Sequence, residues 1–181
     1  MDIPSGIGLM PNGNIDSNRA AAMYLKVKGQ KQGEIKGGTT EKGQEGTIKV
    51  YGLLHAITSP RDAASGLPTG KRMHRPIQIS IGLDKSIPLL YNALVNNENL
   101  PTWKLQYWSA VHKGSASTAT GTGHANTFNV ELTNANIMNI ESITTVNGAI
   151  MYLVGFTYQK IQWTWMDGGI TGMDDWESPV V

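Results

Sequence analysis

Hydrophobic residues along most of this chain recur at every second position, and this period of two constrains the fold more than any other feature. Met23, Leu25 and Val27 alternate with more polar neighbours, and residues 77–81 repeat the pattern with isoleucines. Successive side chains of a β-strand point to opposite faces, so this alternation is typical of half-buried strands. The sequence predicts strands at residues 23–28, 47–57, 75–83, 103–108, 128–132 and 150–166. We therefore expect an all-β fold.

One segment breaks this pattern and predicts a short helix. Within residues 84–100, Ser86 is a suitable N-cap and Pro88 suits the first turn. A single apolar stripe with helical spacing follows, formed by Ile87, Leu90, Tyr91 and Leu94. The expected architecture is a β-barrel of two packed sheets with this one helix flanking it.

The apolar positions of residues 150–166 change parity along the segment. Tyr152, Val154, Phe156 and Tyr158 are even, whereas the apolar positions from Ile161 onward are odd. We interpret this as one long strand with a β-bulge near Gln159 and Lys160. Upstream of it, Asn147-Gly148 predicts a hairpin turn.

The chain length of 181 residues suits one domain, spanning residues 1–181. We expect residues 1–21 to form a flexible arm and residues 167–181 a C-terminal tail, with further loops at 58–74 and 113–126. Charged residues make up only 16% of the chain, which fits a surface partly hidden in an assembly. No signal peptide and no membrane-spanning stretch is evident.

Composition and motifs argue against most chemical functions. The net charge of +1 provides no electrostatic footprint for nucleic acid or for an anionic membrane. The chain has no cysteine, no GxSxG and no Walker A motif, so we expect no catalytic residues, no cofactor and no metal. The histidines lack metal-binding spacing, and the acidic residues Asp174, Asp175 and Glu177 read as a solvated tail.

The tryptophans are the other notable residues. Trp103, Trp108, Trp163 and Trp165 lie in alternating strands, where aromatic residues serve as core or interface anchors, and we assign them as candidate subunit-interface aromatics. A sugar-stacking face on a carbohydrate-binding β-sandwich is the alternative. An enzyme of unrecognised type would need a convergent cluster of titratable residues, which the sequence does not show.

Five segments occur in an order that resembles the haemolysin-coregulated protein (Hcp) family, the tube-forming component of bacterial type VI secretion. They are MYLKVKG, TIKVYGLLHAI, a loop ending in KRMHRPIQI, DKSIPLLYNAL and GFTYQKIQWTW. The helix opens with the family's Lys-Ser/Thr-x-Pro pattern, and the closing strand matches at Phe156, Tyr158, Lys160, Ile161 and Trp163. The resemblance covers about residues 22–166, and the arm, the tail and the loop at 113–126 depart from it.

The resemblance implies a non-enzymatic subunit that forms hexameric rings, and these rings stack into a tube. Implied partners are further copies of the chain, the spike, sheath and baseplate proteins, and effector proteins carried in the lumen. The protein would occupy the bacterial cytoplasm before secretion, without a classical signal peptide. A phage-type tail tube protein would share the barrel and the ring.

The loop at 58–74 is long, polar and without a hydrophobic pattern, which is typical of a functional loop. We expect it to contact the next ring in a stack. Arg61, Lys71, Arg72 and His74 are the candidate charged partners across that junction.

Overall fold

The computed structural model describes residues 21–110, 124–144, 146 and 148–176. The predicted arm at 1–21 and loop at 113–126 therefore lie almost wholly outside the described residues, as does Asn147. The elements are β1 (Ala22–Gly29), β2 (Gly33–Ile35), β3 (Ile48–Leu54), β4 (Ile57–Thr58), β5 (Met73–His74), β6 (Ile77–Gly82), α1 (Ile87–Val95), β7 (Thr102–Ala110), β8 (His124–Thr133), β9 (Asn136–Thr144), β10 (Ile150–Thr157), β11 (Lys160–Trp165), the 3₁₀ turn η2 (Asp167–Gly169) and β12 (Ile170–Asp175).

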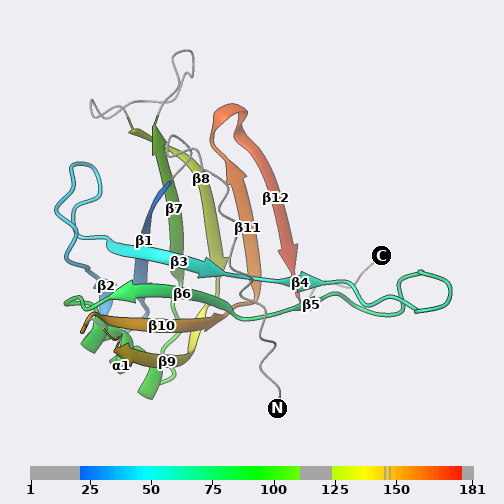
Figure 1. Cartoon of the computed structure of the whole chain (residues 1–181), viewed down its shortest axis with the longest axis horizontal. Coiled ribbons are helices and arrows are strands. Elements are labelled where there is room, and N and C mark those ends of the chain that lie inside the picture. Colours follow the sequence, from blue (N-terminus) through cyan, green and yellow to red (C-terminus); the bar gives the residue numbers. More distant parts are fainter. Residues whose placement is uncertain (1–20, 111–123, 145, 147, 177–181) are drawn as a thin grey trace.

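Ten of the twelve described strands form one sheet in the order β12-β11-β8-β7-β1-β3-β6-β10-β9, with β2 added to β1, and β4 and β5 form a separate two-stranded sheet. This sheet bends at the β1–β3 pair, so that β3, β6, β10 and β9 run across the upright strands β7, β8, β11 and β12 (Figure 1). The mainly β class with one flanking helix is confirmed. The two packed layers are halves of one bent sheet, and its path has two ends, β9 and β12.

Both halves contribute to one hydrophobic core. Leu25, Ile48, Ile79, Leu105 and Val154 are among its residues with essentially no exposed surface. Trp103 of β7 packs edge-on against Phe156 of β10, with ring centroids 5.5 Å apart, and so joins the two halves. Close packing of this kind is what makes core volume changes costly.

The predicted helix is confirmed as α1, which begins after Ser86 and carries Pro88 in its first turn. It buries Ile87, Leu90 and Ala93, and it packs against β9. Among the described residues, no helix is both long enough and apolar enough to cross a membrane.

The predicted single strand at 150–166 is wrong. Residues 150–157 form β10 between β6 and β9, whereas residues 160–165 form β11 between β8 and β12. The chain crosses from one half of the sheet to the other at Tyr158 and Gln159. The change in apolar parity therefore marks a change of layer, because each half presents its own inner face to the shared core. The β9–β10 hairpin is confirmed.

The predicted solvated tail is also corrected. Residues 170–175 form β12, which pairs antiparallel with β11 along its whole length. Asp174 lies opposite Ile161, a core residue, so its carboxylate points toward the inner face of the sheet.

Candidate interaction surfaces

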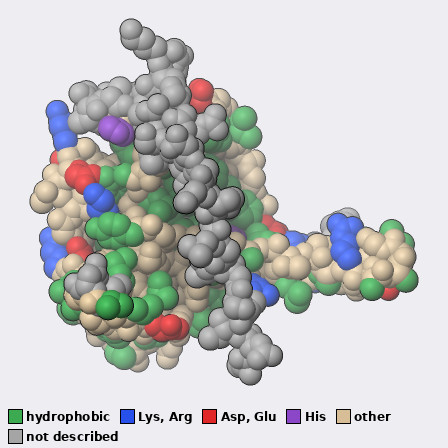
Figure 2. Space-filling view, viewed as in Figure 1, with side chains coloured by type: hydrophobic (Ala, Val, Ile, Leu, Met, Phe, Trp, Pro, Cys, Tyr) green, Lys and Arg blue, Asp and Glu red, His purple; other side chains and the backbone are tan. Residues whose placement is uncertain are grey.

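A hairpin formed by the residues around β4 and β5 projects from the body of the protein (Figures 1 and 2). Only two residue pairs form its ladder, Ile57 with His74 and Thr58 with Met73, and an isolated bridge joins Arg61 to Pro68. Every residue from 61 to 71 is exposed. Leu67 and Met73 expose 65% and 56% of their surface, so the hairpin is less polar than its sequence suggests.

The base of this hairpin is tied to β12 by partly buried charges. Asp174 accepts a hydrogen bond from Arg72 Nε and forms an ion pair with Arg72 Nη2, and His74 Nε2 lies 2.7 Å from Asp174 Oδ2. Arg72 Nη2 also donates to the backbone carbonyl of Asp175, at 2.9 Å. Lys71 donates to the backbone carbonyl of Trp176.

These contacts divide the four residues expected at the ring junction into two pairs. Arg61 and Lys71 are exposed, and their stacking role remains a proposal. Arg72 and His74, by contrast, make contacts within the subunit: Arg72 is paired with Asp174, and the His74 side chain is only 1% exposed. Breaking such a pair to reach another subunit would leave an uncompensated buried charge.

Tyr158 extends this network to the point where the chain changes layer. Its hydroxyl lies 2.6 Å from His55 Nε2 and 3.0 Å from His74 Nδ1. Burial, followed by the charge of Asp174, raises the pKa of Tyr158 well above its ordinary value. Burial and repulsion from His74 lower the pKa of His55. Burial alone would raise the pKa of Asp174, but the hydrogen bonds and charges of Arg72 and His74 outweigh it and lower that pKa.

These shifts predict that acidification destabilises the protein. The unfolded chain takes up a proton on His55 near pH 6.5, whereas folded His55 resists protonation, so stability falls as the pH drops below about 6.5. Asp174 adds a loss at lower pH, below about 4, where the unfolded carboxylate is protonated. Thermal unfolding midpoints from pH 7.5 to 4.5 measure this slope. His55→Gln should flatten it between pH 7 and 5.5, and an unchanged slope would refute the assignment.

A second surface lies at one end of the upright strands. One apolar row crosses five paired strands in register: Met23, Tyr107, Phe128, Trp165 and Ile170. The first three are partly buried against the core, but Trp165 is 48% exposed and Ile170 is 70% exposed. The side chains of this row are therefore more exposed toward β12. In the part of the chain that the structure describes, β12 pairs only with β11, and its outer edge is open.

Apolar side chains are also exposed at the other end of the sheet path. Met138 and Ile143 of β9 expose 48% and 43% of their surface, and Ile150 of β10 exposes 37%. Ile143 pairs with Met151 and Ile150 pairs with Thr144, so Ile143 and Ile150 point to opposite faces of the sheet and form no single patch.

The four candidate interface tryptophans have different environments. Trp103 is 1% exposed and belongs to the core, which corrects its assignment to an interface. Trp163 is partly buried against the core, and Trp165 lies in the apolar row. Trp108 lines a pocket on the outer face. Because they are dispersed in this way, they form no common platform for stacking sugars.

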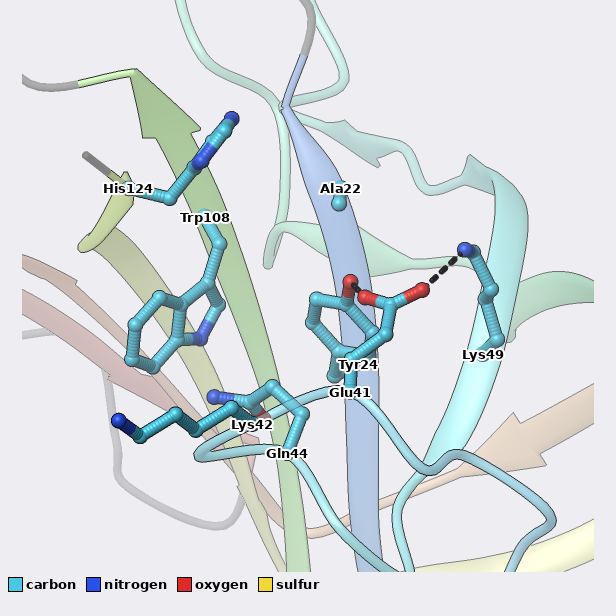
Figure 3. Close-up of a pocket in the computed structure, with 8 residues that line it drawn as sticks. All are labelled: Ala22, Tyr24, Glu41, Lys42, Gln44, Lys49, Trp108 and His124. Atoms are coloured by element: carbon cyan, nitrogen blue, oxygen red, sulfur yellow. Dashed lines mark hydrogen bonds and ion pairs between the residues drawn. The ribbon is translucent and has the colours of Figure 1, made fainter. Parts of the chain in front are cut away.

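The pocket beside Trp108 has a volume of about 450 Å³ (Figure 3). Its one carboxylate, Glu41, accepts a hydrogen bond from the Tyr24 hydroxyl and pairs with Lys49 Nζ at 2.7 Å. Gln44 is 3% exposed, and neither atom of its amide has a hydrogen-bond partner. Within the described residues, no group of three or more histidine, aspartate or glutamate side chains is placed to hold a metal. Glu41 is thus neutralised by its neighbours rather than set up as a base.

The fold and surfaces define the class of this protein as a mainly β subunit with an open edge strand, an exposed apolar row beside that edge and a projecting hairpin. Residues 24–165 match the family described as "Type VI secretion system effector, Hcp". The chain therefore belongs to the Hcp family, the secreted tube proteins of the type VI secretion system.

Individual relatives agree with this assignment. The chain is 34% identical to the "Major exported protein" of Pseudomonas aeruginosa, over 89% of this chain and 98% of that protein. It is similar to a crystal structure of an Hcp protein, with a TM-score of 0.75 and 32% identity over 88% of this chain and all of the other. Secreted protein Hcp3 from Pseudomonas aeruginosa matches with a TM-score of 0.69 and 28% identity, over 88% and 100% of the two chains.

Proposed function

We propose that this chain closes into six-membered rings and that these rings stack into a tube. A closed ring of identical subunits needs two different, complementary surfaces on each subunit. The observation that carries the proposal is the apolar row that ends at Trp165 and Ile170 on the open edge of β12. The second surface that such a ring needs would lie at the other end of the sheet path, where the last strand, β9, exposes Met138 and Ile143. Monomers rarely leave such edges unprotected.

The projecting hairpin is the proposed contact between rings. It extends away from the body of the subunit, and its apolar side chains, such as Leu67, have no cover among the described residues (Figure 2). In the tube, effector proteins would occupy the lumen, and the spike, sheath and baseplate would be the other partners. The protein would leave the bacterial cytoplasm through the secretion machine.

Light scattering on a size-exclusion column, followed by negative-stain microscopy, tests ring formation. A peak at six subunit masses with ring-shaped particles is the expected result. A monomer over a wide range of protein concentrations would overturn the proposal.

A hairpin variant separates stacking from ring closure. Leu67→Ser combined with Met73→Ser should leave rings intact and lower the fraction of stacked rings by roughly 10-fold, since burial of these side chains contributes on the order of 1 kcal/mol each. Val95→Ser, at a 72% exposed position on α1 at the opposite side of the molecule, is the matched control (Figure 1). Equal stacking by both variants would exclude the hairpin as the contact between rings.

A further inference from the structure

Few interactions within the projecting hairpin determine the direction in which it points. Its ladder comprises only two residue pairs, and an isolated two-stranded ribbon is marginally stable in water. Its other backbone bonds are internal: Asp62 donates to the Leu67 carbonyl at 2.9 Å, and Thr69 donates to the Pro60 carbonyl at 3.1 Å. These bonds shape the tip, but they do not connect it to the body.

Asp174 of β12 makes most of the side-chain connections between the hairpin base and the body. It accepts a hydrogen bond from Arg72 Nε and one from His74 Nε2, and it forms an ion pair with Arg72 Nη2. Arg72 and Lys71 also donate to the backbone carbonyls of Asp175 and Trp176. The Asp174 side chain is 16% exposed, and Arg72 is 25% exposed, so the bonds between them are largely shielded from water. Charge-assisted, two-pronged bonds of this kind impose direction as well as strength.

Asp174 is itself held from both sides. On β12 it lies opposite Ile161, so the β11–β12 ladder determines the position of its backbone. Through His74 and the Tyr158 hydroxyl, the network continues to the segment joining β10 and β11. The match to the Hcp family model ends at Trp165, so Asp174 lies beyond the matched residues.

We propose that Asp174 is a latch through which the C-terminal strand β12 fixes the direction of the projecting hairpin and thereby controls ring stacking. The control of stacking rests on the proposed function, but the latch does not. With Asp174 in place, the hairpin meets a second copy of the chain in one preformed orientation. With the latch broken, the hairpin samples many directions, and stacking must first restrict them, which weakens binding.

Protonation is the natural way to open this latch. Acid weakens it at Asp174, because a protonated Asp174 loses the charge on which its ion pair with Arg72 depends. Every element packed around Asp174 contributes charged or titratable groups. The hairpin contributes Lys71, Arg72 and His74, and the β3–β4 link contributes His55. The other groups are Tyr158 from the β10–β11 link, Lys160 from β11 and Asp175 from β12.

Amide hydrogen exchange of the full chain, below the concentration at which rings stack, tests the latch directly. Asp174→Asn should accelerate exchange of the amides at the base of the hairpin, such as Arg75, which donates to the Ala56 carbonyl at 2.9 Å, by roughly 10-fold or more, since charged hydrogen bonds of this kind contribute more than neutral ones. Asp167→Asn, at an exposed position in the same C-terminal segment, is the matched control and should leave these amides unchanged. Hairpin exchange within about two-fold of the parent protein in Asp174→Asn would overturn the proposal.

A second variant distinguishes a broken latch from the loss of β12. Arg72→Gln removes the Arg72 hydrogen bond and ion pair to Asp174 while leaving Asp174 and its strand intact, and it should accelerate the same hairpin amides. The Trp176 amide, which donates to the Gln159 carbonyl at 3.1 Å, reports whether β12 stays in place. Rapid exchange at Trp176 with a protected hairpin would show that the hairpin does not depend on β12, and would overturn the latch.

Microscopy separates this inference from the proposed function. If the parent protein forms no rings, the proposed ring assembly is wrong, but the hydrogen-exchange data still test the latch. If it forms stacked rings, Asp174→Asn should form single rings with at least 10-fold fewer stacks, and Asp167→Asn should stack like the parent. Normal stacking by Asp174→Asn with a loosened hairpin would overturn the control of stacking and leave the latch intact.

Discussion

Replacing Trp103 with alanine should lower the free energy of unfolding by about 3–5 kcal/mol, the usual cost of removing a large buried aromatic side chain. Trp103 is 1% exposed and packs against Phe156 from the other half of the sheet. The cavity left behind would lie between the two halves, where neither can close it without shifting a paired strand. The indole Nε1 has no hydrogen-bond partner in the described structure, so the loss is one of packing.

Urea unfolding followed by circular dichroism, at a fixed protein concentration, measures this loss. Trp165→Ala is the matched control, because Trp165 is 48% exposed and its removal should cost less than about 1 kcal/mol. For ring formation the order of the effects should be reversed: Trp165→Ala should fold but form fewer rings. Equal destabilisation by both changes would contradict the assignment of Trp103 to the core and Trp165 to the surface row.

Gly37→Ala should destabilise the protein by about 1–3 kcal/mol or more, as expected for atoms forced into a packed site. A Cβ at this buried position would lie 2.3 Å from the Thr47 carbonyl oxygen and 2.7 Å from Ile48 Cα. These are backbone atoms, which a rotamer change cannot move. The Gly37 amide also donates to the Gly46 carbonyl at 2.9 Å, so a shift of the chain would strain that bond too.

Thermal unfolding checks this prediction, with Gly70→Ala as the control. At Gly70 the nearest atom to an added Cβ is Pro60 Cγ, at an ordinary contact distance of 3.5 Å. The control should therefore change the unfolding midpoint little. A Gly37→Ala protein as stable as its parent would mean that the loop and β3 are less closely packed than the structure shows.

The base of the hairpin shows why single residues were assigned wrongly from sequence. Arg72 and His74 looked like free charges in a polar loop, and Asp174 looked like part of a solvated tail. Their partners lie about a hundred positions away along the chain, with 100 residues between His74 and Asp174. No periodic pattern carries information about such a pairing, and a charged residue in a loop has the same local signature whether it is exposed or paired.

The sequence by itself determined the local structure and the family. Alternation of apolar side chains predicted β1, β3, β6, β7 and β8 but missed β9 and β12. The spacing of Ile87, Leu90, Tyr91 and Leu94 predicted α1, and the ordered motifs predicted membership of the Hcp family. Only the tertiary structure decided the order of the strands. It separated β10 from β11, placed Trp103 in the core but left Trp165 exposed, and brought Asp174 to the hairpin. The physical reason is that an alternating pattern shows only which side chains share a face of their own strand. The neighbours that cover that face are determined by pairing with strands far away in the sequence.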